Sequence, residues 1–271
     1  MKTKILVAIS VFLSISVFGE VDREKAMAHG MWMMKYHLSP QPDSISEKLK
    51  KFQEAGMFSV DSKQYPILGF LSEAFFMHPE RTEEWMMVIV EFPTQEKRIC
   101  LTAAWLSGTA ETAPYLDKNK ELLTGQNYFG FDYSEQAQPI PSMKRTDVGY
   151  LDMNWGRYMF SGKEEPLRNV LSVLEFMDHM GASKKYLTPK SNEEKQAVWL
   201  ERIGRAAWWS VNSNCKTIPG FKTKLGDLYL EKTLPPKSQN YLGLLLTEAD
   251  SDRFYREEQP DGSLRVYMKK K

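Results

Sequence analysis

Apolar residues recur every three or four positions along most of this chain, and this spacing restricts its fold more than any other feature. Residues at that spacing fall on one stripe of an α-helix, whereas a strand needs strict alternation. The clearest stripes are Ile67, Leu71, Ala74 and Phe75; Trp85, Val88, Ile89 and Phe92; and Leu167, Val170, Leu171, Leu174 and Met177. Alternating patterns are nearly absent from the body of the chain. The sequence therefore predicts an all-α protein.

Helix boundaries can be placed from local signals. Ser44–Glu47 and Ser191–Glu194 have the sequence of capping boxes, and Gly108 and Gly162 suit helix ends that need a left-handed residue. We expect helices near 22–37, 44–55, 66–77, 80–92, 95–107, 148–160, 165–179, 192–213, 221–231 and 238–249.

Two segments do not fit the helical pattern. Residues 109–147 form a long irregular connection, which is uncommon in a compact domain unless it packs or functions. Asp261-Gly262 lies between two β-prone runs near the C-terminus, which indicates a β-hairpin. We therefore expect a helical domain over 20–252, followed by a tail or hairpin over 253–271.

A five-residue pattern, Ala-Ala-Trp-x-Ser, occurs at 103–107 and again at 206–210. Apolar positions of 66–92 also match those of 150–176, with extra residues in the second copy. We interpret this as an internal duplication, with repeats over about 66–108 and 150–213, in a solenoid-like stack of helical hairpins. Chance is the alternative, because Ala and aromatic residues are common in any buried helix.

Trp155-Gly156-x-Tyr158-x-x-Ser161-Gly162 and Ala206-Ala207-x-Trp209-Ser210-x-x-Ser213-Asn214 carry a resemblance to known sequences. Together with the matching segment from Phe70 to Gly108, they resemble a family of uncharacterised exported bacterial helical proteins. The resemblance covers roughly 65–220. It implies a helical fold and export, and it implies no activity, substrate or catalytic residue.

The N-terminus has the layout of a secretory signal peptide. Lys2 and Lys4 precede an uncharged apolar run from Ile5 to Phe18, and Gly19 is a small residue suited to cleavage. The run is too short to span a bilayer comfortably, since a spanning helix needs about 20 residues. A buried N-terminal helix is the alternative. We expect residues 1–19 to be removed, leaving a periplasmic or secreted protein without a stable membrane anchor.

Charge and cysteine content narrow the partners further. The chain has 36 basic and 35 acidic residues, so no overall positive field exists to hold nucleic acid. Cys100 and Cys215 are its two cysteines. In an oxidising compartment they could form one disulfide, although two buried free thiols would serve equally well as packing residues.

Catalytic and metal-binding motifs are absent from the sequence. It contains no His-Glu-x-x-His, no Gly-x-Ser-x-Gly and no phosphate-binding glycine loop, so we predict neither cofactor nor metal. His29 and His37 are better interpreted as solvated or hydrogen-bonded than as ligands. Asp178-His179 with Ser172 or Ser210 forms no recognisable triad, because a triad is defined by geometry.

Two groups of aromatic and amide residues are candidate binding residues: Trp208, Trp209, Asn212 and Asn214, and Tyr128, Phe129, Phe131 and Tyr133. Flat apolar rings beside adaptable polar groups are typical of sugar- and peptide-binding grooves. The first group is also what a packed helix end contains. The second either fixes the long connection onto the body or forms an exposed patch that a partner covers.

We interpret the chain as an exported, non-enzymatic helical protein that mediates interaction with another protein or with a cell-envelope component. The alternative is a periplasmic hydrolase whose site is assembled from separate helices. A deep pocket holding a buried carboxylate or histidine would favour the enzyme. A concave face lined by Trp and Tyr would favour binding.

Overall fold

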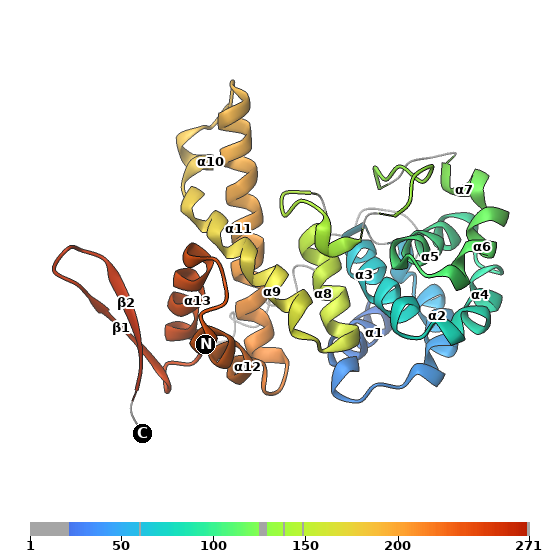
Figure 1. The fold of residues 1–271 in the computed structure, drawn as a ribbon, viewed down its shortest axis with the longest axis horizontal. Helices are drawn as coiled ribbons and strands as arrows, with labels where there is room; N and C mark the ends of the chain where they lie inside the picture. Colours follow the sequence, from blue (N-terminus) through green and yellow to red (C-terminus); the bar gives the residue numbers. More distant parts are fainter. Residues whose placement is uncertain (1–21, 60, 125–128, 138, 148, 270–271) are drawn as a thin grey trace. The chain divides into compact units, whose positions relative to one another are not determined.

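A computed structural model describes residues 22–59, 61–124, 129–137, 139–147 and 149–269. These residues are mainly helical, with a two-stranded antiparallel sheet close to the C-terminus (Figure 1). The predicted fold class, all-α with a C-terminal β-hairpin, is confirmed. The predicted signal peptide, residues 1–19, lies outside the described residues, so export stays a prediction.

The chain divides into two compact units at the Pro166–Leu167 bond. This boundary falls inside the second predicted repeat, residues 150–213. The first unit therefore contains the first predicted repeat and the beginning of the second predicted repeat.

The first unit is built from α-helices joined by short 3₁₀ turns. Its helices are α1 (Arg23–Lys35), α2 (Ile45–Glu54), α3 (Asp61–Met77), α4 (Thr82–Ile89), α5 (Thr94–Ser107), α6 (Ala113–Lys118), α7 (Lys120–Thr124) and α8 (Tyr150–Ser161). The turns are Tyr36–Leu38, Pro42–Ser44, Met57–Ser59, Pro79–Arg81, Ala110–Thr112 and Ile140–Ser142. Residues 109–147 were expected to be irregular throughout, and that expectation is wrong at α6 and α7. Both helices are too short to show a repeated apolar period.

The apolar stripe predicted on α3 faces the core of this unit. Ile67, Leu71, Ala74 and Phe75 of α3 are each at most 1% exposed. Aromatic rings join α3 to its neighbours, and the contacting set is Trp32, Tyr36, Phe52, Phe70 and Phe160. Burial of such rings is the main stabilising contribution available to this unit.

Helices α3 and α8 pack in parallel at very short range. A Cβ at Gly69 would overlap the backbone carbonyl of Met153, and a Cβ at Gly156 would overlap that of Pro66. Glu73 pairs with Arg157, 84 residues further along the chain. Gly69 and Met153 have the same separation, which is also that of the alignment between 66–92 and 150–176. The two segments that resemble each other are thus in direct contact at matching positions.

The second unit is a long helical hairpin with two further helices. Helix α9 (Glu164–Ser172) crosses the unit boundary and continues as the 3₁₀ helix η8 (Val173–His179). After α10 (Ala182–Lys185), the chain returns along α11 (Asn192–Thr217), followed by α12 (Phe221–Glu231) and α13 (Pro236–Ala249). Gly204 allows α11 to pack closely against η8, since a Cβ there would lie 2.8 Å from the backbone nitrogen of Met177.

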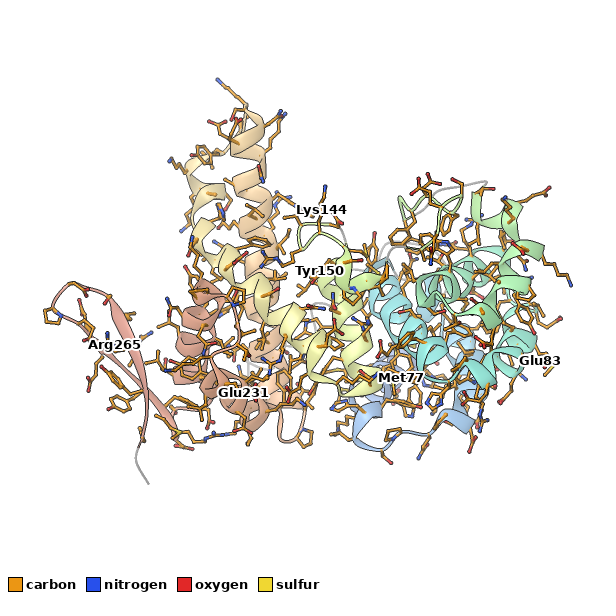
Figure 2. All side chains as sticks on the ribbon, in the orientation of Figure 1. Met77, Glu83, Lys144, Tyr150, Glu231 and Arg265 are labelled. Carbon is orange, nitrogen blue, oxygen red and sulfur yellow. The ribbon has the colours of Figure 1, made fainter. Side chains whose placement is uncertain are left out.

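The hairpin consists of β1 (Phe254–Glu258) and β2 (Leu264–Met268), paired in the register Phe254↔Met268 to Glu258↔Leu264. Phe254 is buried, and its ring lies 5.8 Å from that of Tyr229 on α12. Figure 2 shows the side chains of this ribbon, with Arg265 marked on β2. A two-stranded hairpin is marginal in water by itself, so the packing of Phe254 is what holds it.

The helix-end signals had mixed outcomes. Ser191 and Glu194 form the predicted capping box of α11, and Gly108 and Gly162 end their helices with φ of 65° and 63°. The capping box predicted at Ser44–Glu47 is wrong. The Ser44 hydroxyl donates to the Gln41 carbonyl, because the preceding 3₁₀ turn supplies a nearer acceptor.

Candidate binding site

The aromatic residues of the long connection lie against α5. The rings of Phe131 and Tyr133 lie 5.6 and 5.0 Å from that of Trp105. Phe129 makes an edge contact with Tyr65 of α3 at 5.6 Å. These contacts place the segment on the body of the first unit. Tyr128, the fourth aromatic residue of this group, lies outside the described residues.

Tyr133 is fixed by a hydrogen bond as well as by its ring. Its hydroxyl lies 2.9 Å from the hydroxyl of Thr102, a fully buried residue of α5. Burial raises the pKa of Tyr133, so the phenol stays neutral at physiological pH. The neutral hydroxyl keeps both its donor and its acceptor for Thr102.

A groove of about 450 Å³ opens beside these rings. Its walls come from two stretches of the chain: residues 105–123, which run from the end of α5 through α6 into α7, and residues 133–137. The volume falls in the range of ligand-binding clefts in proteins. The groove lies wholly within the first unit.

Trp105 supplies a large aromatic ring to the lining of the groove. Its ring is half-buried, and its indole N–H has no hydrogen-bond partner among the described residues. The polar side chains around it are exposed and belong to Asp117, Lys120, Glu135 and Gln136. The groove thus offers a flat ring, an unused donor, and charges of both signs.

The second candidate group lies on α11 in the other unit. Trp208, Trp209 and Asn212 are half-buried, and Asn214 is buried. Neither indole makes a ring contact or a hydrogen bond within the part of the chain described here. This group and the group of Phe129, Phe131 and Tyr133 belong to different compact units.

The two alanines that precede these tryptophans differ in their surroundings. Ala207 is fully buried, but Ala206 is exposed, so a neighbouring helix can pack only against Ala207. The close approach is made at Gly204 instead. Ala206 and Ala207 lie about 100° apart around the helix, so only one of them can face η8.

Cys100 and Cys215 are both free thiols. Cys100 is completely buried in α5, and Cys215 is half-buried in α11. Burial raises the pKa of both thiols, that of Cys215 to about 11. The structure therefore contains the packed thiols rather than the disulfide.

The histidines and the serines considered for catalysis have other surroundings. No group of three His, Cys, Asp or Glu side chains that could hold a metal occurs among the described residues. Asp178 pairs with Lys237 and accepts from the Tyr241 hydroxyl. The hydroxyls of Ser172 and Ser210 donate to carbonyls of their own helices. No triad is assembled from these groups.

Asp152 of α8 is a titratable residue that the sequence did not single out. It is half-buried and has no hydrogen bond or ion pair within the described residues. Burial raises its pKa to about 6. An aspartate in a helical stripe carries no sequence signal for this, because the shift depends on neighbours from other segments.

Comparison with known proteins finds no relative of this chain. No family model matches the chain, and neither does a curated protein or a solved structure. None of the helices in the described ranges is long and apolar enough to cross a membrane.

Proposed function

We propose that this chain is an exported, non-enzymatic binding protein that holds a segment of a partner protein or cell-envelope polymer in the groove beside Trp105. The observation that carries the proposal is the half-buried Trp105 ring, with its indole N–H unpaired, in a groove of about 450 Å³. This N–H is accessible to solvent, where it can meet an acceptor. A bound segment would supply one.

The surroundings of the ring support binding. Phe131 and Tyr133 both contact the Trp105 ring, so the ring is in place before a ligand arrives. Pre-ordered aromatic groups lower the entropic cost of association. The polar groups at the rim are exposed to water, as is common in grooves that select ligands by contact.

Site-specific photo-crosslinking tests this proposal. A photoreactive residue placed at Gln136, in the groove, should capture an adduct from cell-envelope extract. The same residue placed at Met87, a 61% exposed position on α4, is the matched control. The Gln136 adduct should disappear when Trp105→Ala is added and should persist when Trp105→Phe is added. The same adducts from both positions, or no effect of Trp105→Ala, would contradict the proposal.

Asp152 supports the hydrolase alternative, because a carboxyl group with a pKa of about 6 can act as a general acid. It does not line the groove beside Trp105. Hydrolysis of envelope glycans or peptides that is abolished by Asp152→Asn, with a limb of its pH profile near 6, would establish this alternative.

A further inference from the structure

We propose that the turn formed by residues 180–190, here named the basic tip, binds the surface of an anionic lipid bilayer, with Leu187 entering the interface. The basic tip joins η8 to α11 and includes α10. This inference concerns a surface of the second unit and does not depend on the groove beside Trp105.

The tip exposes apolar side chains at the end of a projecting element. Leu187 is 86% exposed, and Met180 is 48% exposed. Figure 1 shows that α10 and the adjoining end of α11 extend beyond α12 and α13 of the same unit. A single exposed leucine on a flat surface needs no explanation. At the end of a projection, however, a leucine can reach an interface before α12 and α13 do.

Lysines lie on both sides of Leu187 in the sequence. Lys184, Lys185 and Lys190 are exposed, and none of them forms an ion pair within the described part of the chain. The nearby Glu194 accepts from the backbone nitrogens of Lys190 and Ser191. The carboxylate of Glu194 is thus occupied by the helix N-terminus. Glu193, which is closer in sequence to Lys190, is exposed and forms no ion pair with these lysines in the described part of the chain, so the lysine charges remain available.

An anionic bilayer matches both features of the tip. Its headgroup phosphates attract lysines, each contributing roughly fivefold to binding near the surface. The interface of the bilayer also accepts a leucine side chain. An acidic protein surface would bind the lysines without any need for an exposed leucine. The combination of charge with an apolar apex therefore favours lipid over an acidic partner.

A buried carboxylate of the same unit fixes the conformation of the basic tip. Glu201 of α11, only 1% exposed, accepts hydrogen bonds from the backbone nitrogens of Gly181 and Ser183. These bonds lower the pKa of Glu201 to about 2, so the carboxylate holds the turn at any physiological pH. A turn that is already ordered loses little entropy on binding.

Co-sedimentation with vesicles tests the proposal. The protein should bind vesicles of phosphatidylglycerol and phosphatidylcholine but not vesicles of phosphatidylcholine alone, and about 0.5 M NaCl should release it. Leu187→Ser should lower binding about tenfold or more. Lys184→Gln with Lys190→Gln should also lower it about tenfold or more. Leu230→Ser, at a 46% exposed position on α12, is the control and should bind like the parent.

Leu187 is too exposed for its replacement to disturb the core, and circular dichroism of each variant checks this. Three results would overturn the proposal: no binding of the parent to phosphatidylglycerol vesicles, an equal loss with Leu230→Ser, or a loss with the lysine variant alone. The last result would identify the tip as a site for an acidic partner instead.

Discussion

Glu73 of α3 and Arg157 of α8 form an ion pair in which Nε and Oε2 are 2.8 Å apart, with both side chains almost completely buried. Lys163 lies 3.5 Å from the other carboxylate oxygen, and Arg157 also pairs with Glu165. A buried carboxylate of this kind depends on its partners, since its own desolvation is costly. The network therefore fixes how α3 and α8 are aligned.

Removal of one partner should destabilise the first unit. Arg157→Met leaves Glu73 buried with only Lys163 beside it, and we expect a loss of about 3 kcal/mol in the free energy of unfolding. Urea denaturation measures this loss. Lys51→Ala, which removes the exposed pair with Glu47, should change stability by less than about 1 kcal/mol. Equal effects of the two substitutions would contradict the structural role of Glu73 and Arg157.

Gly69→Ala should also destabilise the protein, because the new methyl group would overlap the backbone of Met153. Backbone cannot move aside as a side chain can, so the cost should reach about 3 kcal/mol. Gly226→Ala is the matched control. Its methyl group would meet only the flexible end of Arg253, and alanine favours a helix by about 1 kcal/mol over glycine. Thermal melting should therefore show opposite trends for the two variants.

Asp152 should make stability depend on pH. Its pKa in the folded protein is about 6, above the ordinary value of 3.8. A raised pKa contributes stability that is fully present below the unfolded value and is lost as pH rises through about 6. Asp152→Asn should thus stabilise the protein at pH 7.5, by at most about 3 kcal/mol, and have little effect near pH 4. Urea midpoints at the two pH values measure this, with Asp117→Asn at an exposed position as control. A benefit that is the same at both pH values would argue against titration of Asp152.

The two cysteines should differ in their reaction with a thiol reagent at pH 8. Burial raises the pKa of Cys215 to about 11, so its labelling should be more than about a hundredfold slower than that of a free thiol. Cys100 is completely buried and should label only after unfolding. Denatured protein should give both thiols without a reductant. A denatured protein that gave neither would indicate the disulfide.

The sequence was sufficient for the longer helices and for the hairpin. The stripe at Ile67, Leu71 and Phe75 is buried as predicted, and α12 has the predicted bounds. The helices that were missed, α6, α7 and α10, have at most two turns, and so show no period. Such helices exist because tertiary contacts hold them, and these contacts are not visible in local sequence.

The candidate site could be predicted only in part. The aromatic run near Phe131 and Tyr133 was recognisable as a candidate. Trp105 was missed as a binding residue, because its Ala-Ala-Trp pattern was interpreted as part of an internal duplication. The contact between this aromatic run and Trp105 was not predictable, because α6 and α7 separate the two in sequence. The close contacts at Gly69 and Gly204 gave even less signal, since a glycine has no side chain from which a neighbour could be inferred.

The matched positions of α3 and α8 also bear on whether α3 of one molecule can pair with α3 of another. Along this contact each position of α3 meets a different residue of α8: Gly69 meets Met153, and Glu73 meets Arg157. Two molecules that paired through α3 alone would place Glu73 against Glu73 in a dry interface, which is strongly unfavourable. The difference in sequence between the two segments thus gives each helix a distinct counterpart. At the high local concentrations of synthesis, α3 of one chain is discouraged from associating with α3 of the next.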